Sequence, residues 1–235
     1  MLRICLFLML ALCLHPAYGQ GTITVENGTL SSTSNYSNMT SYYSLYDGEV
    51  VTLVDESIGT PYLQDDYTLG SIMQKNQVLY SGLYMKLDAL RDIILVKTDL
   101  QQENPMQVTP SSEFSVKIGN QLFVGVASNR GISYCQVLGV GKRAQLLKRH
   151  AKNYKPKSRA TTSLTRDIPA KYLDEVRYYL MDTDANFHEI PRSKRKAAAV
   201  FKGYEDEIEA CIEKYDLDLK EESDLIRLVR YYNSL

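Results

Sequence analysis

The chain has 235 residues, of which 44% are hydrophobic and 23% are charged, and these values exclude a disordered polyelectrolyte or a collagen-like chain. Its formal net charge of −1 hides an asymmetry, because residues 20–140 hold 6 Lys and Arg against 12 Asp and Glu, whereas residues 141–235 hold 20 against 16. Local patches of charge are therefore more informative than the total.

The first element in chain order is a secretory signal peptide, predicted for residues 1–19. Arg3 supplies a positive charge, residues 4–14 are an unbroken apolar run, and Ala17 and Gly19 are small residues before a cut at Gln20. The apolar run is too short for a bilayer, which needs about 20 residues. We therefore expect an exported protein, periplasmic or extracellular, with no transmembrane segment after signal cleavage.

Residues 20–47 form a second segment, rich in Ser, Thr, Asn and Tyr, which is predicted to be exposed and weakly ordered. It contains three Asn-x-Ser/Thr triplets, which begin at Asn27, Asn35 and Asn38. Such triplets are glycosylation sites in a eukaryotic secretory pathway. They also arise by chance in a segment of this composition, and we favour that interpretation.

Residues 48–190 predict a β-rich body, because short β-type runs alternate there with turn residues. The runs lie at residues 50–54, 72–73, 78–80, 84–87, 93–97, 114–118, 122–126 and 134–138, and a last hairpin spans 177–190. Tight turns are expected at Lys75 and Asn76 and at Gly119 and Asn120. Runs of this length indicate an antiparallel meander, folded as a sandwich or a partly open barrel.

Residues 191–235 predict a helical cap of about three helices. Ser193 is the expected N-cap of the first helix and Gly203 its stop, and Glu205 begins the second. One face of the third helix is apolar and is formed by Leu225, Leu228, Val229 and Tyr232. This face requires a partner surface, so the cap is expected to pack against the β-rich body. The predicted fold class is therefore α+β.

Several short stretches form a pattern shared with known proteins. They are residues 59–63, 66–67, Gly70, 115–120, 224–226 and 231–235. Together they resemble a family of uncharacterised exported proteins of Bacteroidota. The resemblance covers about residues 54–235 and is one of pattern rather than of a catalytic signature. It implies a location in a Gram-negative envelope, and it carries over no active-site residue.

Few residues carry catalytic chemistry. After residue 19 the chain has two histidines, His150 and His188, and it has no Gly-x-Ser-x-Gly, His-Glu-x-x-His or Cys-x-x-Cys motif. Cys135 with one of these histidines is a conceivable nucleophilic pair. We favour buried free thiols over a disulfide for Cys135 and Cys211. Residues 182–186 match only the first positions of a calcium loop and predict a polar turn, so we expect no metal and no cofactor.

A basic run between residues 142 and 159, which contains no acid, is the sharpest local feature. Its candidate polyanion-binding residues are Lys142, Arg143, Lys148, Arg149, Lys152, Lys155, Lys157 and Arg159. Clustered cations bind polyanions by releasing counterions. The interpretation that we favour is structural: lysines protect a strand edge from aggregation, and the acidic N-terminal half supplies their internal partners.

The sequence does not identify a reaction. The leading hypothesis is an exported, non-catalytic envelope protein that binds or scaffolds another component, such as an envelope protein or a glycan. One alternative is a hydrolase of envelope or extracellular polymer, because a two-carboxylate mechanism requires geometry and no motif. A further alternative is a polyanion-binding module that uses the 142–159 run. No nucleic acid is expected, since Tyr154 is the only aromatic residue in that run.

Overall fold

The computed structural model describes residues 23–26, 29–32, 57–128, 131–159 and 166–235. The chain divides into two units, Met1–Asp47 and Gly48–Leu235. The predicted signal peptide, the three Asn residues of the glycosylation triplets and the β-type run at residues 50–54 lie outside the described residues.

The first unit contains a short hairpin of strands β1 (Ile23–Glu26) and β2 (Thr29–Ser32), which pair antiparallel. These eight residues form strands within the segment that is predicted to be exposed and weakly ordered. The sequence contains the signal for this hairpin, because β-type residues flank an Asn-Gly pair. The high proportion of Ser, Thr and Asn in the surrounding segment concealed it.

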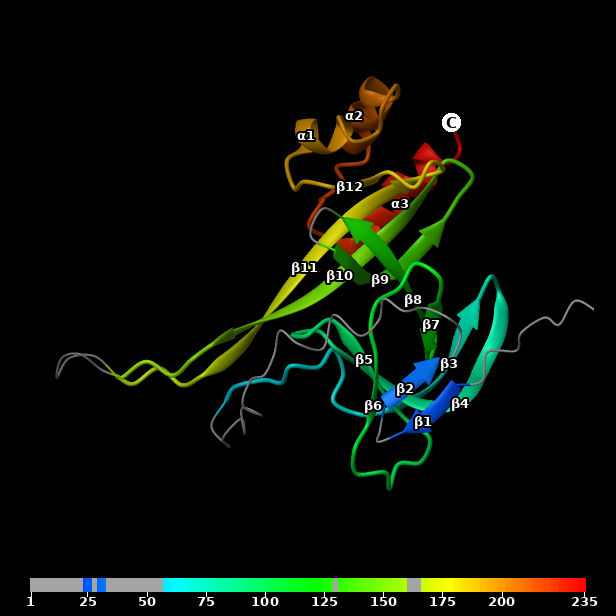
Figure 1. Cartoon of the computed structure of the whole chain (residues 1–235). Helices are drawn as coiled ribbons and strands as arrows, with labels where there is room; N and C mark the ends of the chain where they lie inside the picture. Colours follow the sequence, from blue (N-terminus) through cyan, green and yellow to red (C-terminus); the bar gives the residue numbers. More distant parts are fainter. Residues whose placement is uncertain (1–22, 27–28, 33–56, 129–130, 160–165) are drawn as a thin grey trace, which may run out of the picture. The chain divides into compact units, whose positions relative to one another are not determined.

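The described part of the second unit contains one antiparallel sheet of ten strands. The strands are β3 (Thr68–Gln74), β4 (Gln77–Asp88), β5 (Ile93–Lys97), β6 (Met106–Val108), β7 (Ser115–Ile118), β8 (Gln121–Ser128), β9 (Gly131–Val140), β10 (Ala144–Lys155), β11 (Lys171–Asp182) and β12 (Phe187–Glu189). Their order is β12-β11-β10-β9-β8-β7-β3-β4-β5-β6 (Figure 1). The predicted α+β class is confirmed, and the sheet does not close into a barrel.

Both predicted tight turns are present. Lys75 and Asn76 join β3 to β4 with φ values of 46° and 66°, which is the left-handed pair that a two-residue hairpin requires. Gly119, with a φ of 57°, joins β7 to β8. The predicted runs at residues 78–80 and 84–87 are two parts of the single strand β4, whose pairing with β3 shifts register twice.

Strand β9 changes its neighbours along its length. It pairs with β8 from Gly131 to Gln136 and with β10 from Gln136 to Val140. Strand β10 therefore loses β9 beyond Lys148, yet it remains paired with β11 as far as Lys155. The outer half of β10 and the facing half of β11 thus form a two-stranded ribbon, which runs past the end of β9 (Figure 1).

The described part of the second unit ends in three helices, α1 (Lys194–Ala198), α2 (Glu205–Lys214) and α3 (Glu222–Tyr232). Their apolar side chains pack on one face of β10 and β11, where Leu146 and Leu180 share a core cluster with Phe201, Ile212 and Leu228. This packing confirms that the cap belongs to the fold. None of the helices in the described residues is long and apolar enough to span a membrane.

The first helix is shorter than predicted. Ser193 occupies the N-cap position, but its side chain makes no capping hydrogen bond. The helix ends at Ala198 because the following residues form 3₁₀-type hydrogen bonds. The Val200 N–H donates to the carbonyl oxygen of Ala197, and the Phe201 N–H donates to that of Ala198. Gly203, with a φ of 81°, lies after these hydrogen-bonded residues and shortly before α2.

The end of α3 is fixed to the turn between β9 and β10 by the side chain of Asn233. Its Oδ1 accepts hydrogen bonds from the N–H groups of Arg143 (2.9 Å) and Ala144 (3.0 Å), and its Nδ2 donates to the carbonyl oxygen of Ala144 (3.1 Å). The turn leaves no space beside this amide, since a Cβ atom at Gly141 would lie 2.1 Å from Asn233 Cγ. The amide therefore replaces backbone partners that the turn itself does not supply.

Replacing Asn233 with Ala should lower the free energy of unfolding by about 2–3 kcal/mol, because the partly buried groups of Arg143 and Ala144 lose their partner. Ser234→Ala is the control: its hydroxyl is exposed and bonds only locally to Tyr231, so the expected change is within about 0.5 kcal/mol. Urea denaturation of both variants tests this. Equal midpoints for the two variants would show that the Asn233 bonds do not contribute.

Candidate functional site

The eight predicted polyanion-binding residues do not lie on one surface. Lys142 and Arg143 belong to the turn before β10, whereas Lys157 and Arg159 follow its other end. Strand β10 has 12 residues and therefore separates these two pairs by about 40 Å, at roughly 3.3 Å per residue. The Arg143 guanidinium lies 4.7 Å from the centre of the Tyr204 ring, so it contacts the helical cap.

The cations within β10 point to opposite faces of the sheet. Side chains alternate along a strand, and Lys148 and Lys152 are in phase with Leu146, which packs against the helices. Arg149 and Lys155 are in phase with Leu147, which belongs to the core cluster on the other face. A run that is continuous in sequence is thus divided between two surfaces.

The three central cations have acidic partners inside the protein. Lys148 Nζ lies 2.6 Å from Glu222 Oε2 of α3, and Lys152 Nζ lies 2.6 Å from Asp174 Oδ1 of β11. The expectation that the N-terminal half supplies the partners is therefore wrong for both lysines, and correct only for Arg149, whose guanidinium lies 3.7 Å from Asp92 Oδ2.

The prediction of a strand edge is wrong for the first part of β10 and correct for the second. From Gln145 to Lys148 the strand lies between β9 and β11. Beyond Lys148 it is paired on the β11 side only, apart from one hydrogen bond from the Lys152 N–H to the carbonyl oxygen of Ala89 (3.0 Å). The sequence could not show where β9 ends its pairing.

The remaining cations belong to the outer part of the ribbon. We call residues 153–159 and 166–171 the arm. Its cations are Lys155, Lys157, Arg159, Arg166 and Lys171, and its one acid is Asp167. Arg166 and Lys171 were missed because the basic run was counted only to Arg159. The hairpin register reveals Lys171, which faces Lys155 across the ribbon.

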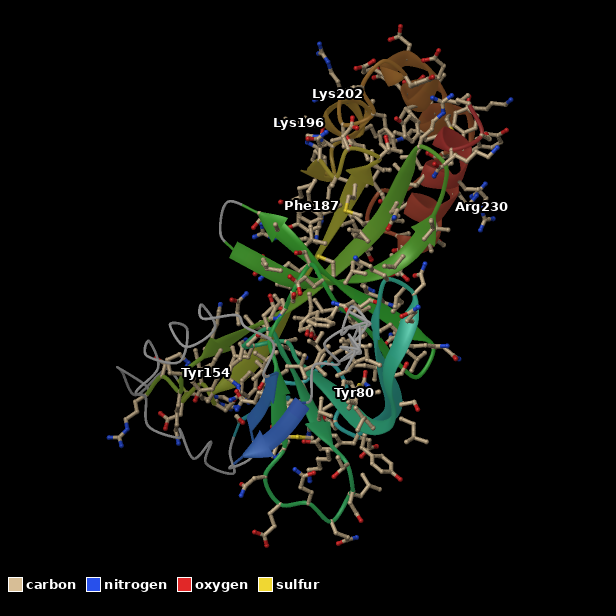
Figure 2. The ribbon with its side chains drawn as sticks, turned by 45° about the vertical axis from the view of Figure 1, so that its right-hand side comes forward. Tyr80, Tyr154, Phe187, Lys196, Lys202 and Arg230 are labelled. Atoms are coloured by element: carbon tan, nitrogen blue, oxygen red, sulfur yellow. The ribbon has the colours of Figure 1, made fainter. Side chains whose placement is uncertain are left out.

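The arm is exposed beyond its base. At the base, Ile58 bridges to Lys171 on one side. Further out, Ser158 and Ile168 form an isolated bridge, and all described residues from Asn153 to Arg159 and from Arg166 to Pro169 are exposed. Ile168 has 55% and Tyr154 39% of its surface exposed. Figure 2 shows Tyr154 at the opposite end of the unit from Lys196, Lys202 and Arg230.

The conceivable pairing of Cys135 with a histidine is contradicted by the sheet. Cys135 packs with Leu147 on one face, whereas His150 is in phase with Leu146 on the helix-covered face. His188 pairs with Leu180, which also lies on the helix-covered face. Burial, followed by the charge of nearby Asp92, raises the pKa of the Cys135 thiol to about 12, so the thiol stays protonated.

Cys135 and Cys211, the cysteines among the described residues, are free and buried, as expected. Cys135 lies on β9, and Cys211 lies on α2 within the core cluster that joins the helices to the sheet. The structure therefore places both as packed side chains.

The predicted polar turn after β11 is confirmed. Asp182 Oδ1 accepts hydrogen bonds from the N–H groups of Asp184 (3.0 Å) and Asn186 (2.8 Å), and Oδ2 accepts one from Asn186 Nδ2 (2.8 Å). These bonds, led by the Asn186 side chain, lower the pKa of the Asp182 carboxyl. Both carboxylate oxygens therefore serve the turn itself. The described residues contain no cluster of His, Cys, Asp and Glu suited to a metal ion.

The sequence predicts a polar break between the runs at residues 84–87 and 93–97, and the structure has a turn there, between β4 and β5. The role of this turn is not evident from the sequence: it lies where β9 and β10 separate. Asp92 Oδ1 accepts a hydrogen bond from the Tyr134 N–H of β9 (3.1 Å), and its other oxygen faces Arg149 of β10. The carbonyl oxygen of Ala89 accepts a hydrogen bond from the Lys152 N–H of β10. The turn thus accepts hydrogen bonds from one N–H group of β9 and one of β10, at the place where these two strands no longer pair with each other. A left-handed φ of 56° at Asp92 was the feature that no local pattern indicated.

Burial raises the pKa of the Asp92 carboxyl, although the Tyr134 N–H, the Ser133 hydroxyl and Arg149 all favour the ionised form. A raised pKa is a property of general acids. The described groups around Asp92 are hydrogen-bond donors and a cation, and this is the environment of a carboxylate that positions a turn.

A second buried charge fixes the segment before β3. Lys86 Nζ lies 3.6 Å from the centre of the Tyr62 ring and 4.7 Å from that of Tyr67, and it donates a hydrogen bond to the carbonyl oxygen of Asp65 (3.1 Å). Burial lowers the pKa of this ammonium group, opposed most by the charge of Asp65. The two rings stabilise the cation and hold residues 62–67 against β4.

Replacing Asp92 with Asn should preserve most of the stability at neutral pH, because an amide oxygen still accepts the Tyr134 N–H. Asp92→Ala should cost about 1–3 kcal/mol, because that N–H loses its partner. Since the folded pKa of Asp92 is raised, wild type should gain stability relative to the Asn variant as pH falls towards the ordinary Asp value and lose it as pH rises. Denaturation at several pH values checks this; an equal cost for both variants contradicts the proposed hydrogen bond.

His150 should destabilise the fold in mild acid. Burial, followed by the nearby Lys148 charge, lowers its pKa from 6.5 to about 4, and its Nε2 lies 2.7 Å from Gln136 Oε1. The unfolded chain therefore binds the proton first, and stability is lost as pH falls from 6.5 to about 4, by about 2–3 kcal/mol. His150→Gln should remove this loss. NMR titration of the ring and acid denaturation test it, and identical acid profiles would refute it.

Comparison with protein-family models, with curated protein sequences and with solved structures finds no match to this chain. The resemblance to exported proteins of Bacteroidota therefore depends on its sequence pattern alone.

Proposed function

We propose that this chain is an exported, non-catalytic envelope protein that binds or scaffolds another component, and that the arm makes the contact. The signal peptide predicted for residues 1–19 supports the location, and the arm supports the mode of action. The partner meets a narrow, positively charged ribbon that is held at its base by a large sheet.

The observation that carries this proposal is the contrast between two sets of cations on one hairpin. Lys148, Arg149 and Lys152 are paired with acids of the fold. In the arm that follows, Lys155, Arg159, Arg166 and Lys171 form no ion pair with the described residues, and the first three of them are exposed. A charged, exposed strand pair has no role in the described core, and it increases the self-repulsion of the folded chain. Its charges are suited to a partner of opposite sign.

One observation favours the hydrolase alternative, namely the raised pKa of Asp92. A two-carboxylate mechanism also requires a second acid that faces the first across a substrate. The turn position of Asp92 and its bonds to β9 and β10 favour a structural role. Asp92→Asn separates the two proposals, because loss of polymer hydrolysis without loss of stability would support the enzyme.

The test is recruitment of the full chain to envelope membranes of a Gram-negative host. Reversing Lys155, Arg159 and Arg166 to Glu should move the protein from the sedimented envelope fraction to the supernatant, because the contact with the partner is lost. The melting temperature should remain unchanged, because none of these three residues has an ion pair within the described structure.

The matched control reverses Lys196, Lys202 and Arg230, which are exposed at the helical end (Figure 2). It changes the net charge by the same amount and should leave the protein in the envelope fraction. Equal sedimentation of the two triple variants contradicts a contact through the arm.

A further inference from the structure

We infer that the arm docks on an anionic lipid surface, a conclusion that rests on the proposed function and names its partner. Three features of the described arm carry it: its protrusion, its charge and its exposed apolar side chains. Each feature excludes a different class of partner.

Protrusion favours a flat partner. Beyond the bridge of Ile58 to Lys171, the backbone hydrogen bonds of the described arm residues lie within the ribbon. A narrow ribbon reaches a plane before the sheet and helices do (Figure 1). A flexible chain such as a glycan or a nucleic acid is usually held in a groove that follows its backbone, and the arm offers an edge instead.

The charge favours an anionic surface over a neutral one. Lys155, Arg159, Arg166 and Lys171 form no ion pair with the described residues. Each Lys or Arg close to an anionic leaflet strengthens binding by about fivefold. Lys155 and Lys171 face each other across the ribbon, so cations lie on both of its strands, and several of them can approach one plane together.

The apolar side chains favour lipid over a hydrated polyanion. Ile168 is 55% exposed and lies opposite Ser158, within the set of cations. Tyr154 is 39% exposed and packs on Tyr172 at the base, with ring centres 5.1 Å apart. Tyrosine is enriched at membrane interfaces, and an aliphatic side chain leaves water only against an apolar surface, which the acyl chains of a lipid supply. A soluble polyanion gives Ile168 no such environment.

The experiment uses the full chain and sedimentation with vesicles of phosphatidylcholine, with and without phosphatidylglycerol. Wild type should bind the anionic vesicles, bind neutral vesicles at least about tenfold more weakly, and dissociate as salt is added. Reversing Lys155, Arg159 and Arg166 should weaken binding at least about a hundredfold, by the per-residue effect above. The control with Lys196, Lys202 and Arg230 reversed should bind like wild type.

A second variant tests the lipid itself. Ile168→Ser should weaken vesicle binding about fivefold, because less apolar surface leaves water, and it should leave retention on heparin unchanged. Val140→Ser, at a side chain that is 72% exposed outside the arm, should change neither.

Retention on heparin without vesicle binding would overturn the inference and assign the arm to a soluble polyanion. Equal binding of the two triple variants to anionic vesicles would overturn it as well. If the arm variant loses envelope recruitment while wild type ignores the vesicles, only the lipid partner is wrong. If envelope recruitment does not depend on the arm, the proposed function itself fails.

Discussion

The structure depends on one constraint, which is that β9 cannot follow both of its neighbours. It pairs with β8 in its first half and with β10 in its second half. Strands β9 and β10 therefore separate beyond Gln136 and Lys148, a place that we call the fork. Their backbone groups at the fork need other partners, since a buried N–H without an acceptor is costly. The turn from Asp88 to Asp92 supplies them through the Asp92 carboxylate and the Ala89 carbonyl oxygen. This arrangement releases β10 and β11 as a separate ribbon.

The same constraint explains why one basic strand has two kinds of cation. Near the fork, helix α3 covers the ribbon, and Glu222 lies close enough to pair with Lys148 and to accept a hydrogen bond from the Tyr178 hydroxyl (3.2 Å). Burial and this carboxylate raise the pKa of Tyr178 to about 12. Lys152 pairs instead with Asp174 of β11, and Arg149 pairs with Asp92 of the turn between β4 and β5. Farther out, no described helix covers the ribbon, and Lys155, Arg159 and Arg166 are exposed to solvent. The cations of the strand thus differ in their distance from the acids of the fold.

The sequence predicts what depends on neighbouring residues. The turn at Lys75 and Asn76, the hairpin before Phe187 and the three helices follow from local backbone preferences and periodicity. The fork, the ion pairs of Lys148 and Lys152, and the role of Asp92 depend on contacts between distant segments, so no local pattern indicates them. The candidate site was found in part for the same reason: the run to Arg159 is local, whereas Lys171 joins it only through strand register.

The hydrogen bonds between the Asn233 side chain and the turn from β9 to β10 have a consequence for the order of folding. The bonds to Arg143 and Ala144 join residues that are 90 and 89 positions apart. Contacts of such separation form late, because closing a long loop costs entropy before any bond is gained. The turn between β9 and β10 therefore stays incompletely bonded until residue 233 arrives. During synthesis, the meander from β3 to β8 is able to assemble first, while the helix-bearing half waits for the end of α3.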